Sequence, residues 1–276
     1  MCRALKVSES GYYRRLRNRN KITKRQLLSV EILKIIDEHP DNSNYGYERI
    51  HTALRQRGIN VSKGTVRRAM RDGGLLHKRR LPHGITKADS ETQERENLIQ
   101  RNFRAETALH KLLTDITEVP CRDGKLYLSP IMDCCAGDIV ALETRNNMKK
   151  ELCVDTVKQL RQRYGKLKNA ILHSDRGSQY TSEAFRKELE KSGLTQSLSG
   201  TGRCYDNARM ESFFATLKKE KLYQIPTHRM TREEVKSEVF RYIFGYYNTQ
   251  RVTSFNPDGL PPAVYKRLLE AKTEAA

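Results

Sequence analysis

The spacing of hydrophobic residues in the first third of the chain predicts helices. Leucine and isoleucine residues recur on or near one side of a helix over residues 26–38. A second helix is predicted over residues 47–56 and a third over residues 63–71, with Ser62 as the N-cap of the third. A short turn that contains Gly58 joins the last two. Two helices connected in this way have the proportions of a helix-turn-helix.

From about residue 110 the pattern changes to short β-rich runs separated by longer amphipathic stretches. Strands are predicted over residues 111–121, 125–132, 139–144, 169–174 and 195–199, and helices over residues 150–164, 182–191, 231–247 and around Glu211, the last capped by Asp206 or Asn207. Asp123 and Gly124 separate the first two strands, and this dipeptide favours a β-hairpin. The order of the elements predicts an α/β fold in which helices cover a sheet. The polar stretch over residues 72–105 is predicted to be a linker, helical in part around residues 91–100.

The distribution of charge points to a polyanionic partner. The chain carries a net charge of +19, with 52 Lys and Arg against 33 Asp and Glu. Residues 1–87 hold 21 Lys and Arg against 7 Asp and Glu, whereas the remaining residues hold 31 against 26. A basic surplus concentrated in one segment is typical of proteins that bind nucleic acid, although a hydrated basic surface without a partner has the same composition.

The sequence contains no run of apolar residues long enough to cross a membrane and no apolar signal segment at its N-terminus. Its six cysteines have neither the paired spacing nor the histidine neighbours of a zinc site, and the same spacing argues against a disulfide framework. We therefore expect a cytoplasmic protein with reduced thiols and no membrane partner.

Three acidic residues stand where a structural role is hard to find. Asp115 lies inside the first predicted strand, Asp175 directly follows the fourth, and Glu211 lies in a predicted helix. Strands are depleted in aspartate, and carboxylates brought together repel one another unless hard divalent cations neutralise them. Two such ions, typically about 3.5–4 Å apart, hold the attacking and leaving oxygens of a phosphodiester. The pattern therefore predicts a cation-dependent enzyme that cuts or joins nucleic acid.

Other residues have both a functional and a structural interpretation. Lys218 lies seven residues after Glu211 on the same helix face, where it either contacts DNA or is an ordinary solvated lysine. The first helices either contact DNA or form a small bundle whose basic face has no specific partner. If they contact DNA, the residues that face phosphates or base edges are Lys63, Arg67, Arg68 and Arg71. Asp133 also ends a predicted strand, but no motif surrounds it and we interpret it as structural. His173 is either a general base or, as such residues more often are, a hydrogen-bonded neighbour that orients the site. It has no His or Cys partner at ligand spacing, so we do not expect it to bind a metal.

Three motifs taken together resemble those of a known family. They cover residues 114–117 (TDIT), 173–180 (HSDRGSQY) and 206–214 (DNARMESFF). They are similar to the signatures of second-frame transposases of the bacterial insertion-sequence-three family, which belong to the retroviral-integrase-like group with a D-D-(35)-E spacing. In this sequence 35 residues lie between Asp175 and Glu211.

The resemblance implies an RNase H-like mixed-sheet core flanked by helices, with an N-terminal helix-turn-helix-like region and a helical C-terminal tail. It implies that Asp115, Asp175 and Glu211 bind two Mg²⁺ ions, for which Mn²⁺ can substitute. It also implies that Lys218 contacts DNA. The implied reaction frees a 3′-OH at each transposon end by hydrolysis and then joins this hydroxyl to another DNA strand.

The implied partners are double-stranded DNA with terminal inverted repeats, target DNA and further copies of the chain on paired ends, in the nucleoid of a bacterial cytoplasm. This family usually fuses a first-frame DNA-binding segment to the enzyme by ribosomal frameshifting, and we expect this chain to lack that segment. We predict a basic DNA-binding region at residues 1–87, a linker at 88–109, an integrase catalytic core at 110–225 and a helical extension at 226–276.

Two other functions remain compatible with the residues. An RNase H-like nuclease needs the three carboxylates but does not join strands, and it has less need of a basic helix-turn-helix. A non-enzymatic DNA-binding regulator needs residues 1–87, and in such a protein Asp115, Asp175 and Glu211 have no catalytic role. An assay with transposon-end DNA and Mg²⁺ distinguishes the three functions. Strand-transfer products indicate a transposase, hydrolysis alone indicates a nuclease, and metal-independent binding without cleavage indicates a regulator.

Overall fold

The structure is a computed structural model that describes residues 8–18, 23–76, 97–100, 102–200 and 207–274. The chain folds as two compact units, residues 1–79 and 80–276, which are described separately. Three predictions fall on residues outside the described ranges: the boundary at residue 87, the possible cap Asp206 and most of the helix around residues 91–100. The described end of that predicted helix forms bends and a turn over residues 98–100. No helix in the described part of the chain is long and apolar enough to cross a membrane.

The first unit consists of helices whose buried sides follow the hydrophobic spacing. The helices are α1 (Glu9–Arg17), α2 (Lys24–Asp37), α3 (Tyr47–Gln56) and α4 (Lys63–Asp72), with a 3-10 turn at Pro40–Asn44. A capping box of Thr23 and Gln26 begins α2, and the Thr65 N–H donates to Ser62 Oγ at the start of α4. The buried core of α2, α3 and α4 contains Leu28, Ile32, Ile35, Ile50, Leu54, Val66 and Met70. The three predicted helices are confirmed.

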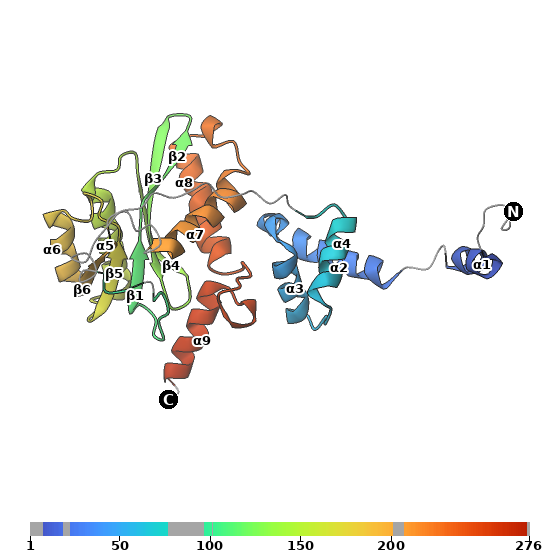
Figure 1. The fold of residues 1–276 in the computed structure, drawn as a ribbon. Helices are drawn as coiled ribbons and strands as arrows, with labels where there is room; N and C mark the ends of the chain where they lie inside the picture. The colour runs from blue at the N-terminus through green and yellow to red at the C-terminus, as the bar shows by residue number, and fades with distance from the viewer. Residues whose placement is uncertain (1–7, 19–22, 77–96, 101, 201–206, 275–276) are drawn as a thin grey trace. The chain divides into compact units, whose positions relative to one another are not determined.

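In the described part of the second unit, six strands form a mixed sheet (Figure 1). They are β1 (Lys111–Thr114), β2 (Thr117–Cys121), β3 (Gly124–Asp133), β4 (Ile139–Arg145), β5 (Ala170–Ser174) and β6 (Leu194–Leu198). β3 pairs antiparallel with β4 and, along its other edge, with both β1 and β2. β1 is parallel to β5, and β5 is parallel to β6. The predicted α/β sheet and the hairpin between β2 and β3 are confirmed.

The first predicted strand is interrupted at Asp115, which corrects the expectation that this residue lies inside one continuous strand. β1 ends at Thr114 and β2 begins at Thr117, yet both keep a single register against β3. That register places Pro130 opposite Asp115. Proline has no N–H to donate across the ladder, and the Pro130 carbonyl accepts a hydrogen bond from Thr114 Oγ1 at 2.9 Å. The strand therefore continues in direction but loses its regular pairing at the carboxylate.

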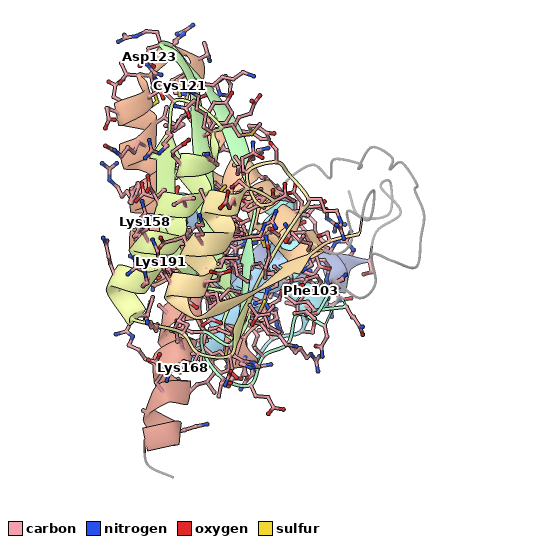
Figure 2. The ribbon with its side chains drawn as sticks, turned by 90° about the vertical axis from the view of Figure 1, so that its left-hand side faces the viewer. Phe103, Cys121, Asp123, Lys158, Lys168 and Lys191 are labelled. Carbon is pink, nitrogen blue, oxygen red and sulfur yellow. The ribbon has the colours of Figure 1, made fainter. Side chains whose placement is uncertain are left out.

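Helices cover the sheet and connect its parallel strands. They are α5 (Lys150–Tyr164), α6 (Glu183–Ser192), α7 (Ala208–Leu217), α8 (Arg232–Phe240) and α9 (Pro262–Glu274), with π-helical segments at Lys218–Leu222 and Arg241–Tyr247 and 3-10 turns at Thr227–Arg229 and Pro257–Gly259. Val157 and Leu160 of α5 and Phe185 and Leu189 of α6 belong to one core with residues of β1, β3, β4 and β5. Figure 2 shows the outer side of these two helices, with Lys158 on α5 and Lys191 on α6.

A buried ion pair attaches α9 to the turn between β3 and β4. Lys266 Nζ lies 3.2 Å from an Asp133 carboxylate oxygen and 3.3 Å from an Asp138 carboxylate oxygen. Asp133 also accepts hydrogen bonds from the backbone N–H groups of Leu109 and Cys135. The interpretation of Asp133 as a structural residue is therefore confirmed.

A second buried ion pair joins the two π-helical segments to the residues that follow them. Arg251 donates to the Glu220 carboxylate through Nε at 2.8 Å and through Nη2 at 2.9 Å, and the Tyr242 hydroxyl donates to it at 2.9 Å. Glu220 is 4% exposed and Arg251 is 6% exposed. Because Glu220 lies on the segment that continues α7, this pair holds the far end of the helix that carries Glu211.

Candidate active site

Two of the three predicted carboxylates directly follow the ends of the neighbouring parallel strands β1 and β5. β1 pairs with β5 so that Leu113 is opposite His173. The same offset places Asp115, two residues further on, beside Asp175, where adjacent strands are about 4.8 Å apart. Ile116 packs against the core that α5 and α6 cover, and successive side chains of a strand point to opposite faces. The Asp115 carboxylate therefore projects from the other face of the sheet.

Burial and neighbouring charges disfavour the ionised form of Asp115. Its side chain is half-buried, and burial is the largest cause that raises its pKa from 3.8 to about 7. The Ile116 N–H, which donates to Asp115 Oδ1 at 2.8 Å, lowers this pKa. The negative charges of Asp175 and Glu211 raise it, and the positive charge of Lys218 lowers it. The three carboxylates and this lysine therefore interact electrostatically within one region.

Asp175 directly follows β5 and is held by the loop that it begins. The Gly177 N–H donates to Asp175 Oδ1 at 2.9 Å, and Ser174 Oγ donates to the Asp175 carbonyl at 3.0 Å. A Cβ atom at position 177 would lie 3.0 Å from Asp175 Oδ1 and 2.9 Å from Gln179 Oε1, which is closer than ordinary contacts allow. Glycine therefore lets the loop close around a carboxylate that remains exposed to solvent.

Glu211 lies on α7, whose other side is buried. Met210, Phe213 and Leu217 are at most 2% exposed, as their helical spacing predicts, and Glu211 is left exposed. Lys218 begins the π-helical segment and is half-exposed. Asn207 Nδ2 donates to the Thr114 carbonyl at 3.3 Å, so the start of α7 lies near the end of β1, where the charges of Glu211 and Lys218 act on Asp115.

His173 is fully buried, and hydrogen bonds hold both of its ring nitrogens. Nδ1 lies 2.8 Å from Ser197 Oγ, and Nε2 lies 3.0 Å from Ser199 Oγ. Ser197 lies on β6 and Ser199 directly follows it, so the imidazole ties β6 to β5 two residues before Asp175. The prediction of a hydrogen-bonded neighbour of the site is confirmed.

Arg209 fixes the first turn of α7, and the sequence gives no signal for this role. Its Nη1 donates to the carbonyl oxygens of Phe103 at 2.9 Å and Cys134 at 2.6 Å. Its guanidinium carbon lies 3.6 Å from the centre of the Phe255 ring, in a cation–π contact. These partners come from three separate parts of the chain, so only the folded structure shows that Arg209 sets the position of Glu211.

The carboxylates do not form a closed metal cage as they stand. Among the described residues, no group of three or more His, Cys, Asp or Glu side chains is arranged so that it could hold a metal ion. Asp115 is half-buried, whereas Asp175 and Glu211 are exposed, and the Glu211 side chain can change rotamer on the outer side of α7. The assignment of these three residues as metal ligands stays a prediction.

Sequence comparison gives matches along most of the chain. Residues 105–204 and 211–268 match families described as integrase core domain, and residues 23–83 match a family described as HTH-like domain. The chain is 31% identical, over 96% of its length and 92% of the relative's, to the transposase InsF for insertion sequence IS3A of Escherichia coli (strain K12). It is 36% identical, over 83% of its length and 90% of the relative's, to the transposase for insertion sequence element IS904 of Lactococcus lactis subsp. lactis (strain IL1403). The chain belongs to the IS3 family of transposases.

This transposase therefore combines an HTH-like domain with an integrase core domain. Its mixed sheet with flanking helices is the expected RNase H-like core. Among solved structures, the catalytic core domain of BIV integrase is 18% identical, with a TM-score of 0.44, and the match covers 60% of this chain and 99% of that one. Family membership favours the transposase over the two alternatives, a nuclease and a regulator.

The HTH-like domain of the transposase presents its predicted basic residues on α4. This helix buries Val66, Ala69 and Met70. The exposed residues of the same helix include Lys63, Arg67, Arg68 and Arg71. All four also have partners within the unit. The Arg67 guanidinium carbon lies 5.8 Å from the Tyr47 ring centre, and Lys63 Nζ lies 3.6 Å from a Glu48 carboxylate oxygen. Arg68 Nε donates to the Gly64 carbonyl at 3.3 Å, and Arg71 Nε lies 3.8 Å from an Asp72 carboxylate oxygen. Contact of these four side chains with DNA stays a prediction.

Proposed function

We propose that this transposase frees a 3′-OH at each transposon end and joins it to another DNA strand at a site formed by Asp115, Asp175 and Glu211. The observation that carries this proposal is the register of β1 against β5, which brings Asp115 beside Asp175. The charges of Asp175 and Glu211 also raise the pKa of Asp115. Carboxylates from a strand, a loop and a helix that repel one another are an unfavourable arrangement unless a positive ligand joins them.

The donor set fits Mg²⁺, with Mn²⁺ as a substitute. All three side chains offer oxygen atoms, and Mg²⁺ prefers oxygen ligands and keeps several waters, so a few carboxylates and a substrate phosphate suffice. The raised pKa of Asp115 fits as well, because a nearby cation favours the ionised form that burial opposes. Two such ions, when bound, neutralise the phosphate and hold the attacking and leaving oxygens of the phosphodiester.

Each residue of the site has its own task in this proposal. Asp115 and Asp175 supply carboxylate oxygens from positions just after the ends of the adjacent strands β1 and β5, and the Gly177 N–H fixes the orientation of Asp175. Glu211 supplies the third carboxylate from α7, and Lys218 binds a DNA phosphate next to it. In the first step water attacks the phosphorus, breaks the P–O3′ bond and leaves a 3′-OH. In the second step that hydroxyl attacks a phosphorus of another strand and displaces its 3′ oxygen.

We assign recognition of the terminal inverted repeats to the basic region at residues 1–87, through α4. The assignment is supported by the exposure of the four basic side chains Lys63, Arg67, Arg68 and Arg71. Residues 88–109 link this region to the catalytic core at 110–225, which residues 226–276 extend. Further copies of the chain assemble on paired ends and on target DNA, and a first-frame segment fused by frameshifting completes end recognition.

Labelled transposon-end DNA, incubated with the full chain and Mg²⁺, tests the proposal. Strand-transfer products that require Mg²⁺ are expected. Hydrolysis without joining would instead indicate a nuclease, and binding without metal-dependent cleavage would indicate a regulator. Glu183→Gln, which changes an exposed glutamate on α6, is the matched control for Glu211→Gln and should leave all products unchanged.

A further inference from the structure

Asn207 is a buried amide at the junction of β1 and α7. It is 5% exposed and occupies the N-cap position of α7. Its Nδ2 donates to the carbonyl oxygen of Thr114 at 3.3 Å, and Thr114 directly precedes Asp115. Asn207 is also the residue at which α7 begins, and Glu211 lies in the first turn of that helix. One amide therefore joins the residue before Asp115 to the start of the helix that carries Glu211.

The other half of this amide has no partner. Asn207 Oδ1 is buried and accepts no hydrogen bond from any described residue. An asparagine at an N-cap ordinarily accepts from a backbone N–H of the first helical turn, but Asn207 makes no such bond. Buried polar atoms are nearly always hydrogen-bonded, and an exception at a functional site often marks the place of a water or an ion.

A water bound to a divalent cation is a suitable hydrogen-bond donor to the unpaired Asn207 Oδ1. Mg²⁺ is reluctant to lose its waters and usually keeps several of them when it binds to protein carboxylates. Waters held in this way are strong hydrogen-bond donors, and acceptors beyond the direct ligands orient them. Asn207 Oδ1 is a neutral acceptor, so it adds no further negative charge to a region that already contains three carboxylates.

We propose that Asn207 Oδ1 accepts a hydrogen bond from a water of the bound divalent cation, while Nδ2 keeps the end of β1 against α7. Asn207 is thus a positioning residue that raises the affinity of the site for the cation. This inference rests on the proposed function, because it requires a cation at Asp115, Asp175 and Glu211. Loss of an acceptor of this kind typically lowers metal affinity about tenfold or more.

Asn256 provides a matched control. It is 4% exposed, its Nδ2 donates to the carbonyl oxygens of Ala136 and Leu260, and its Oδ1 is likewise without a partner among the described residues. None of these contacts involves a proposed ligand. Asn207→Ala and Asn256→Ala therefore each remove one buried amide with one unpaired oxygen, but only the first removes an acceptor next to the site.

The inference is tested by measuring the affinity of the full chain for Mn²⁺ without DNA. Electron paramagnetic resonance reports binding as a loss of the free-ion signal. Asn207→Ala should raise the dissociation constant about tenfold, and Asn256→Ala should leave it unchanged. Thermal unfolding in EDTA checks that both variants are folded. Asn207→Asp loses the Nδ2 donor to Thr114, as Asn207→Ala does, but keeps an acceptor oxygen, so it should bind Mn²⁺ more tightly than Asn207→Ala.

Two results overturn the inference in distinguishable ways. If the wild type binds Mn²⁺ and folded Asn207→Ala binds it equally well, Asn207 does not act on the cation, although the proposed function stands. Equal weakening in Asn207→Asp and Asn207→Ala likewise excludes the acceptor role. If the wild type itself binds no Mn²⁺, or Glu211→Gln leaves its affinity unchanged, the proposed cation site fails and the role of Asn207 fails with it.

Discussion

Replacing Asp115 with asparagine should stabilise the cation-free protein at neutral and alkaline pH. In the native state the pKa of Asp115 is raised from 3.8 to about 7, mainly by burial. Between these two values the native state binds a proton that the unfolded state has released, so the free energy of unfolding falls as pH rises through this window. One pKa unit corresponds to about 1.4 kcal/mol, so a shift of roughly three units gives an upper limit of ~4 kcal/mol at about pH 8.

Urea unfolding in EDTA, followed by far-ultraviolet circular dichroism at several pH values from about 4 to 8, measures this effect. Asparagine keeps the oxygen that accepts the Ile116 N–H but has no charge to bury. The stability advantage of Asp115→Asn should be small at the acid end and grow to a few kcal/mol at about pH 8. Mg²⁺ should reduce the advantage, because only the wild type then gains a cation ligand. Parallel pH profiles for the two proteins would refute the reasoning.

Three further predictions follow from other parts of the structure. Glu211→Gln should abolish cleavage and leave DNA affinity, measured by fluorescence anisotropy, nearly unchanged; retained cleavage would contradict its role as a ligand. Arg67→Ala with Arg68→Ala should weaken DNA binding and reduce the slope of log K against log salt by about two, and an unchanged slope would show that α4 does not touch phosphate. Arg251→Ala should destabilise the protein to urea by about 3–5 kcal/mol, because it leaves the Glu220 carboxylate buried without its partner; a loss below about 1 kcal/mol would contradict this.

Local patterns in the sequence predict much of the second unit. Asp123 and Gly124 locate the hairpin between β2 and β3, because few other dipeptides fit so tight a turn. The helical spacing of Met210, Phe213 and Leu217 predicts which side of α7 is buried, and this leaves Glu211 outside. Such features depend on residues close together in the chain, so one sequence is enough to find them.

Features that depend on distant residues could not be predicted in this way. The break at Asp115 requires Pro130, which reaches it only through the register of β1, β2 and β3. The amide of Asn207 meets Thr114 across 93 positions of the sequence. The sequence identifies Asp115 as a candidate, because an aspartate is unusual inside a hydrophobic run. Its raised pKa could not be predicted, because it depends on burial and on charged neighbours that only the folded chain brings together.

The central claim is that Asp115, Asp175 and Glu211 bind a common pair of divalent ions. Crystals of the full chain soaked in Mn²⁺ and measured at the manganese absorption edge test it directly. Two anomalous peaks are predicted between the three side chains, with carboxylate oxygens of all three within about 2.1–2.3 Å of one ion or the other. Ordered manganese that leaves any one of the three carboxylates without a bond to an ion would contradict the account.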